Sequence, residues 1–161
     1  MGRLDRDSEG LLFFTNDKRL NDLLLNPTHR HEREYWVQVE GNPQKDELLP
    51  LEKGIKIKNY QTLPAKVHLL ELPLNLPERI PPIRYRKTIP TAWLSLTLTE
   101  GRNRQVRHMT AAIGYPTLRL VRVRIENILL KDLEVAQVRR LEKKKVQDLS
   151  ESLSLPRERE R

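Results

Sequence analysis

The sequence of 161 residues contains no cysteine. Disulfide frameworks, thiolate zinc sites, iron–sulfur clusters and cysteine nucleophiles all require that side chain, so these classes are excluded. The sequence also has no apolar run near the ~20 residues that span a membrane. Its first residues contain no hydrophobic signal segment. We therefore expect a cytoplasmic protein that does not bind to a membrane.

Aromatic residues are scarce at 5%, and hydrophobic residues make up only 37% of the chain. This low apolar share means that part of the chain need not pack into a core. Positive charge is plentiful, because 30 lysines and arginines face 22 acidic residues and leave a net charge of +8. Such a surplus suits a polyanionic partner, most often nucleic acid, although basic surfaces also serve solubility.

Strand-like and helix-like segments follow one another without a regular strand–helix–strand alternation, which predicts an α+β fold. Apolar runs or alternation predict strands at residues 11–15, 35–40, 55–58, 65–70, 91–99 and 118–125. Capping and stop signals predict helices at residues 17–25, 44–53 and 103–113. In the strand at 118–125 the alternation of apolar residues shifts by one position. A bulge near Leu120 or Val121 would place the apolar residues on both sides of the shift on one face of the sheet. The proline-rich stretch 72–90 is predicted to be a loop.

From about residue 141 the apolar pattern gives way to runs of charge. Such a segment buries too little apolar surface to offset the entropy of ordering it. We therefore predict one domain over residues 1–140 and, over residues 141–161, a charged tail that is disordered or forms a frayed helix.

The segment Gly2–Gly10 is the first candidate for chemistry, because it concentrates carboxylates beside arginines. Asp5, Asp7 and Glu9 match the opening of a calcium loop, but the twelfth position is Asn16 rather than a bidentate glutamate. A solvated turn before a strand is a second interpretation. A third is a carboxylate that acts as an acid, base or nucleophile, with Arg3 and Arg6 close in sequence to Asp5.

The second candidate is the segment from Arg102 to Arg124, which contains six arginines and no acidic residue. On the predicted helix, Arg104, Arg107 and His108 share one face, opposite the apolar stripe. This could be an ordinary soluble face, but such faces usually mix charges of both signs. Guanidinium groups clustered without acids favour a phosphate or carboxylate partner. His29 and His31 could share a strand face as metal ligands, although no third ligand is near in sequence.

These segments resemble, in order and spacing, the motifs of RsuA/RluE-type pseudouridine synthases. The resemblance lies in Gly2-Arg3-Leu4-Asp5-Arg6-Asp7-Ser8-Glu9-Gly10-Leu11-Leu12, Tyr35-Trp36-Val37-Gln38-Val39-Glu40-Gly41, Pro81-Pro82-Ile83-Arg84-Tyr85-Arg86-Lys87 and Glu100-Gly101-Arg102-Asn103-Arg104-Gln105-Val106-Arg107. It covers roughly residues 2–140 and is nearest to the RluE branch, which acts on large-subunit ribosomal RNA. It implies a curved, mixed, mostly antiparallel sheet with peripheral helices, and an enzyme without metal or cofactor.

The resemblance also implies roles for individual residues. Asp5 stands where the family has its catalytic aspartate, Tyr35 matches the tyrosine that stacks on the target base, and Arg107 matches the arginine that pairs with the aspartate. From pattern alone, Tyr35 could equally be an ordinary core tyrosine. We expect five further residues to contact RNA: Arg3, Arg84, Lys87, Arg102 and Arg104.

Three departures from the family pattern qualify these expectations. His108 stands where relatives have arginine, and Glu126 stands near a position that is usually glycine. The family also has a strand-bearing segment before the Gly-Arg-Leu-Asp motif, so we expect the first strand of its sheet to be missing here. The function predicted is a monomeric synthase that isomerises a uridine of large-subunit ribosomal RNA. The alternative is a non-catalytic RNA-binding or ribosome-assembly protein, or an inactive fragment, on the same scaffold.

Overall fold

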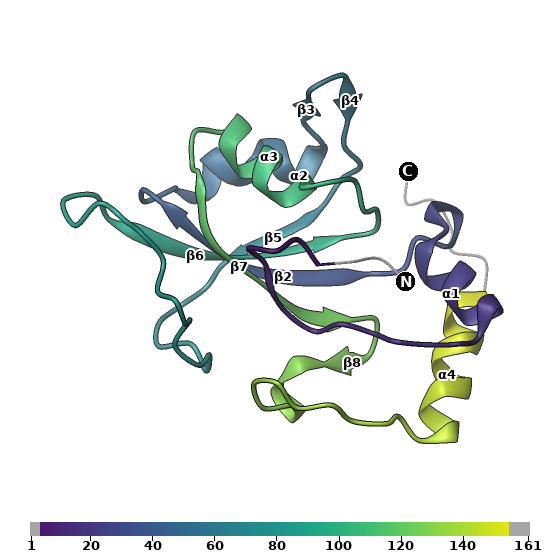
Figure 1. The fold of residues 1–161 in the computed structure, drawn as a ribbon. Helices are drawn as coiled ribbons and strands as arrows, with labels where there is room; N and C mark the ends of the chain where they lie inside the picture. The colour runs from purple at the N-terminus through teal and green to yellow at the C-terminus, as the bar shows by residue number, and fades with distance from the viewer. Residues whose placement is uncertain (1–3, 155–161) are drawn as a thin grey trace.

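The computed structural model describes residues 4–154, apart from the side chain of Asp132. Figure 1 shows an open sheet with α2 and α3 over one face and with α1 and α4 at one end. The elements are β1 (Glu9–Gly10), α1 (Lys18–Leu25), η1 (Pro27–His29), β2 (Arg33–Glu40), η2 (Lys45–Leu48), α2 (Leu49–Lys53), β3 (Lys56–Ile57), β4 (Tyr60–Gln61), β5 (Lys66–Leu69), β6 (Thr91–Leu98), α3 (Gln105–Ala112), β7 (Thr117–Ile125), β8 (Ile128–Leu129), η3 (Leu130–Asp132) and α4 (Lys143–Ser154), where η marks a 3-10 helix.

The sheet has the strand order β1-β7-β2-β6-β5, and β8 pairs with β7. Only β1 runs parallel to its neighbour, while the other pairs are antiparallel. The predicted α+β architecture, with a mixed and mostly antiparallel sheet and peripheral helices, is confirmed. A separate two-stranded ribbon pairs β3 with β4.

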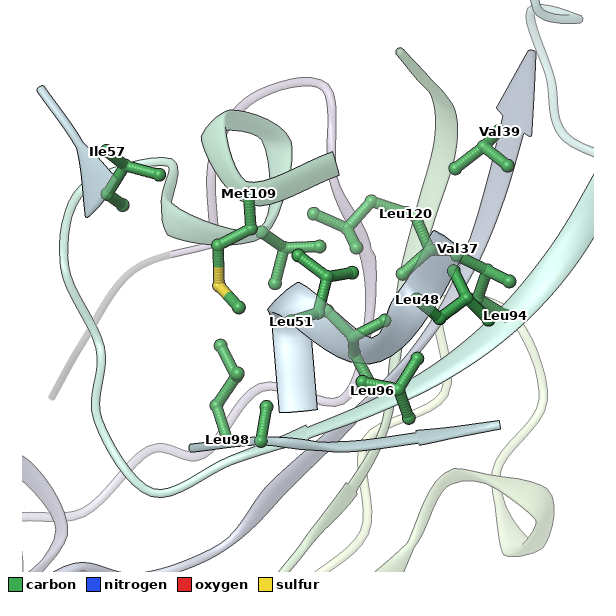
Figure 2. Packing of buried hydrophobic residues seen from close by; sticks show 13 residues of the cluster. Val37, Val39, Leu48, Leu51, Ile57, Leu94, Leu96, Leu98, Met109 and Leu120 are labelled. Atoms are coloured by element: carbon green, nitrogen blue, oxygen red, sulfur yellow. The ribbon is translucent and has the colours of Figure 1, made fainter. Parts of the chain in front are cut away.

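The main core lies between the sheet and the helices α2 and α3, as Figure 2 shows. Alternate residues of the central strands point into it, and α3 adds Val106 and Met109. Val37, Leu94 and Leu96 are fully buried. Because side chains alternate between the two faces of a strand, Tyr35 shares this face with Val37 and Val39.

A second core joins α1 to α4 at the end of the sheet, where the two helices lie side by side (Figure 1). Leu149 and Leu153 of α4 are 1% and 0% exposed, and they pack with Leu20 and Leu24 of α1. Of the two alternatives for the charged tail, disorder is therefore wrong over Lys143–Ser154, which form a helix. Apolar residues four positions apart supply one buried stripe on an otherwise charged helix. Residues 155–161 lie outside the described part of the chain.

Two other local predictions need correction. Residues 11–15 do not form a strand, because the chain pairs with β7 only at Glu9 and Gly10. The predicted defect in β7 is present as two irregularities rather than one near Leu120. Leu118 and Val123 have no partner in the register with β2. As a result, Leu120 pairs with Val37 and Arg122 pairs with Tyr35, on the same face of the sheet.

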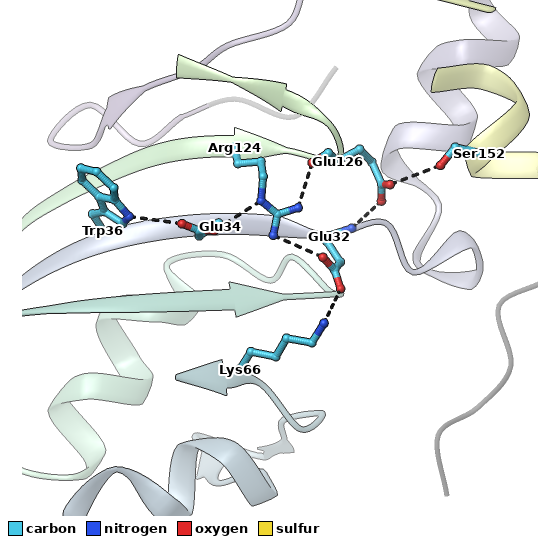
Figure 3. A network of polar contacts seen from close by, with 7 residues as sticks. All are labelled: Glu32, Glu34, Trp36, Lys66, Arg124, Glu126 and Ser152. Atoms are coloured by element: carbon cyan, nitrogen blue, oxygen red, sulfur yellow. Dashed lines mark hydrogen bonds and ion pairs between the residues drawn. The ribbon is translucent and has the colours of Figure 1, made fainter. Parts of the chain in front are cut away.

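The outer face of the sheet is held by a polar network that joins β2, β5, β7 and α4 (Figure 3). Arg124 donates to Glu32 and Glu34 at 3.2 and 3.3 Å, and Lys66 donates to Glu32 at 3.0 Å. Glu126 adopts the left-handed conformation, with φ of 51°, that glycine accepts most readily. Its carboxylate accepts from the backbone N–H of Glu32 at 2.6 Å and from Ser152 at 3.4 Å. These contacts give a physical reason for glutamate at this turn.

Candidate active site

The carboxylates of the Gly2–Gly10 segment are presented by a tight turn that leads into β1. The N–H of Ser8 donates to the carbonyl of Asp5 at 3.0 Å, and the N–H of Leu11 donates to the carbonyl of Arg122 at 2.8 Å. Gly10 has φ of 106°, and a Cβ there would lie 2.3 Å from the Arg122 carbonyl oxygen. Only glycine allows β1 to approach β7 this closely, so Gly10 fixes where the turn lies.

The arginine-rich loop before α3 is rigidly attached through Glu100. This buried carboxylate accepts from the N–H of Leu63 at 2.8 Å, from Gln105 Nε2 at 2.7 Å and from the Tyr60 hydroxyl. Gln105 in turn accepts from the N–H of Arg102 at 3.1 Å. The guanidinium of Arg102 lies 3.3 Å from the centre of the Tyr60 ring, on which it stacks. The loop therefore presents its arginines from a fixed backbone.

The turn and the arginine loop meet through Asp5, Asp7, Arg104 and Arg107. Arg104 binds Asp7 with both terminal nitrogens at 3.1 Å, and its Nη1 lies 3.6 Å from Asp5 Oδ2. Arg107 Nη2 donates to the Asp7 carbonyl at 3.1 Å and lies 3.6 Å from the Asp7 carboxylate. Arg107 was expected to pair with Asp5, but it contacts Asp7 and Ser8, and Arg104 is the ion partner of Asp5.

These contacts shift the titration of both charges. The bidentate hydrogen bonds from Arg104, assisted by the charge of Arg107, hold the pKa of Asp7 below its ordinary value. Burial lowers the pKa of Arg107, and nearby Arg104 and Arg79 lower it further, while Asp7 and Asp5 oppose the shift. Asp7 therefore stays ionised at lower pH than an unperturbed aspartate does. The Asp5 side chain is one-third exposed, at 33%.

Tyr35 lies on the same side of the sheet as α3, across β7 from the turn that carries Asp5 and Asp7. It pairs with Arg122 of β7, and Arg122 pairs with Gly10 of β1. Since adjacent strands are about 4.8 Å apart, β1 and β2 are separated by roughly 10 Å. Tyr35 is half-buried and packs against the main core. Tyr35 therefore packs against the core and stays partly exposed, and its role toward a base remains a prediction.

The structure separates the other predicted contact residues into two groups. Arg102 and Arg104 are exposed on the loop before α3, where Arg104 contacts Asp5 and Asp7 and Arg102 stacks on Tyr60. Arg84 and Lys87 are exposed on the loop between β5 and β6. Arg3 lies outside the described residues.

The candidate segments predicted from the sequence contain Asp7, Glu9 and Arg122, but the sequence did not indicate which residues these three contact. Asp7 stands in the same motif as Asp5, and that proximity was the available signal. Arg122 is 6% exposed, donates from Nε to the Leu11 carbonyl at 2.8 Å and leaves Nη2 without a hydrogen-bond partner. The frame change in β7 was the only hint that this arginine turns inward. Nothing local in the sequence connects Glu9 to Arg119, its partner at 2.8 Å.

Neither metal hypothesis gains support from the described residues, 4–154, where no group of three or more histidine or acidic side chains is arranged to hold an ion. His31 is buried and its Nε2 accepts from Arg33 at 2.9 Å. No helix in this part of the chain has the length and apolar character needed to cross a membrane.

Comparison with known proteins identifies the family to which this chain belongs. The model of the family described as RNA pseudouridylate synthase matches residues 1–112. The chain belongs to this family. The match contains the carboxylate turn, β2 with Tyr35, the loop between β5 and β6, and α3, so all the predicted site residues fall within it.

Individual relatives of this RNA pseudouridylate synthase family agree. The chain is 54% identical over 136 residues to the ribosomal large subunit pseudouridine synthase E of Vibrio parahaemolyticus, covering 84% of this chain and 57% of that protein. It is 56% identical over 124 residues to the protein of the same name from Xanthomonas axonopodis pv. citri, covering 77% of this chain and 65% of that protein. The chain thus spans about three-fifths of the length of these relatives.

A solved pseudouridylate synthase has the same fold, with a TM-score of 0.75 at 27% identity. The likeness covers 92% of this chain and 57% of that one.

Proposed function

We propose that this protein isomerises a uridine to pseudouridine in large-subunit ribosomal RNA, with Asp5 as the catalytic carboxylate. The observation that carries the proposal is the position of Asp5. Its partly exposed carboxylate lies 3.6 Å from Arg104, on a turn fixed against β7, in a chain of the RNA pseudouridylate synthase family.

The reaction requires a carboxylate that stays ionised next to an extruded nucleoside. The bond between ribose C1′ and uracil N1 breaks, the base rotates, and a bond forms between C1′ and C5. The proton at C5 is lost and N1 gains one, so the product is an isomer of the substrate. Asp5 can serve as a covalent nucleophile, at C6 of the base or at C1′, or it can stabilise positive charge on the sugar. No oxidant, metal or cofactor is required for this balance.

The neighbouring side chains bind the base, hold the turn and contact the phosphates. The Tyr35 ring offers a flat surface for the flipped uracil on the face of the sheet that α3 covers. Arg104 forms an ion pair with Asp5, and Arg107 acts on the turn through Asp7. Arg102, Arg104, Arg84 and Lys87 contact phosphates, which orient the strand without reading its sequence.

A non-catalytic RNA-binding protein is the second candidate. It is favoured by the exposed cations Arg84 and Lys87, which lie on a different loop from Asp5 and could bind RNA without it. It predicts RNA binding that depends on salt and no formation of pseudouridine.

Asp5→Asn distinguishes the two, because it keeps the size of the side chain and removes its charge. The protein is incubated with an unmodified transcript of large-subunit ribosomal RNA, and pseudouridine is mapped chemically. We expect product with the wild type, a loss of at least about a thousandfold in rate with Asp5→Asn, and RNA affinity within about threefold. Asp148→Asn, an exposed change on α4, is the matched control. Equal product from Asp5→Asn, or none from the wild type, would disprove the catalytic proposal.

A further inference from the structure

The turn of residues 5–8, which carries Asp5, is the catalytic turn under the proposed function. Glu9 joins it to two distant segments. It lies on β1, four residues after Asp5, and its carboxylate binds Arg119 of β7 in a bidentate pair at 2.8 and 2.9 Å. The same carboxylate lies 3.4 Å from Nε of Arg79, which belongs to the proline-rich loop between β5 and β6. One acidic side chain therefore holds two arginines from separate parts of the chain.

These contacts attach the loop at a defined place. Arg119 Nη2 also donates to the carbonyl of Pro77 at 2.8 Å, so the pair with Glu9 holds the loop through its backbone as well. Near the other end of the loop, Arg86 pairs with Glu40 at 3.2 Å. Between these two attachments Ile80 is 92% exposed and Tyr85 is 55% exposed.

The two attachments differ in strength. The side chains of Arg119 and Glu9 are 11% and 27% exposed, and Arg119 also lies 5.9 Å from the centre of the Trp93 ring. Arg86 is 73% exposed, and exposed ion pairs contribute little. At the other attachment the loop contributes Arg79, which is 22% exposed and lies 3.4 Å from Glu9, and the Pro77 carbonyl, which accepts from Arg119. The partly buried bidentate pair of Glu9 with Arg119 fixes the direction of both side chains that the loop contacts. Glu9, together with Arg119, is therefore the main attachment of the loop.

We infer that Glu9 is a positioning residue that holds the loop of residues 72–90 beside the catalytic turn, so that Arg84, Tyr85 and Lys87 contact the RNA strand next to the target uridine. The inference rests on the proposed function. Tyr85 supplies an exposed ring on which an unpaired base can stack, and the flanking cations bind the backbone. The rigid link from Glu9 to Asp5 then sets the distance between this contact and the reacting nucleotide.

Glu9→Gln tests the inference because it keeps the shape of the side chain and removes its charge. We expect KM for the RNA to rise about tenfold, while kcat at saturating RNA stays within about twofold, since the loop binds substrate and does not touch the reacting atoms. Trypsin reports the loop independently, because it cleaves after Arg84, Arg86 and Lys87. Cleavage at these sites should become at least about fivefold faster as the loop detaches.

Two further variants make the test decisive. Arg79→Gln removes the contact from the side of the loop and leaves the pair of Glu9 and Arg119 intact, so it decides the matter if Glu9→Gln fails to fold. Glu78→Gln removes a neighbouring exposed charge and should behave as the wild type in both measurements.

The result that overturns the inference is unchanged trypsin cleavage in Glu9→Gln and Arg79→Gln, or a fall in kcat with KM unchanged. If the wild type forms no pseudouridine, the proposed function fails. The trypsin result then still decides whether Glu9 holds the loop.

Discussion

Asp7 takes the guanidinium contacts that family resemblance assigns to Asp5. Its two oxygens bind Arg104 at 3.1 Å each, in the geometry that arginine also uses for phosphate. Asp5, two residues earlier, keeps a longer contact with the same arginine. The Asp5 carboxylate thus stays partly exposed, while Asp7 fixes the turn.

The shifted titration of Asp7 predicts part of the acid sensitivity of the fold. Because its folded pKa lies below the unfolded value of about 3.9, its contribution to stability is complete above that pH and is lost as pH falls through the folded pKa. Asp7→Asn should therefore lower the free energy of unfolding at pH 7, and the difference from the wild type should shrink below about pH 4. Urea unfolding between pH 2.5 and pH 7 measures this, with Asp148→Asn as a control for the lost charge. A difference that stays constant with pH would refute the assignment.

The close approach of β1 to β7 at Gly10 predicts a loss of stability when a side chain is added there. Gly10→Ala places a methyl group 2.3 Å from the Arg122 carbonyl at a φ of 106°, so β1 must move away from β7. We expect the free energy of unfolding to fall by about 3 kcal/mol. Gly114→Ala is the matched control, because φ there is also positive, at 86°, but the added Cβ meets no atom within 4 Å. Equal losses in the two variants would show that backbone strain alone, without the close approach, is responsible.

The motif was enough to single out Asp5, Tyr35 and Arg107 as candidates, and their catalytic roles stay predictions. The motif could not assign the partners within the site. Whether Arg107 faces Asp5 or Asp7 depends on where α3 sits on the sheet, and the partner of Glu9 lies 110 residues away. Contacts of this kind are set by tertiary packing, which a local pattern does not contain.

Among the elements, those with strong local signals were predicted best. The helix α1 begins after Asp17, whose carboxylate accepts from the N–H groups of Arg19 and Leu20, and it ends at Asn26, as the cap and the following proline predict. The strands β2 and β6 follow from clean alternation. The strand predicted at residues 11–15 was wrong, because the apolar Leu11 packs into the second core with residues of α1, α4, β7 and β8 and the segment does not pair as a strand.

The sequence did not distinguish a helix from disorder at α4, because the average composition of this segment is polar, although two of its leucines are buried. Leu153→Ala should lower the free energy of unfolding by about 3 kcal/mol, since it leaves a cavity in the second core. Lys144→Ala, on the exposed side of the same helix, should change it by less than about 0.5 kcal/mol. Urea unfolding compares the two, and equal small effects would mean that α4 does not pack as described.

For the molecule as a whole, the charge of +8 predicts RNA binding that weakens steeply with salt. Each phosphate contact to a single strand contributes about 0.7 to the slope of log affinity against log salt. The double variant Arg84→Ala/Lys87→Ala should therefore reduce the slope by about 1.4, which titrations at several salt concentrations measure. Lys53→Ala/Lys144→Ala removes the same charge elsewhere and should reduce it less. Equal reductions would indicate binding to net charge rather than to the loop.

The pairing of β1 with β7 also determines when the turn that carries Asp5 can form during synthesis. The turn is made early, yet it is held by Arg104, Arg107 and the backbone at Arg122, about a hundred residues later in the chain. A nascent chain emerges from its N-terminus, so Asp5 leaves the ribosome long before the groups that orient it. Translation must therefore run through β7 before the carboxylate takes its place, and a chain interrupted before that strand would contain the aspartate but not the site.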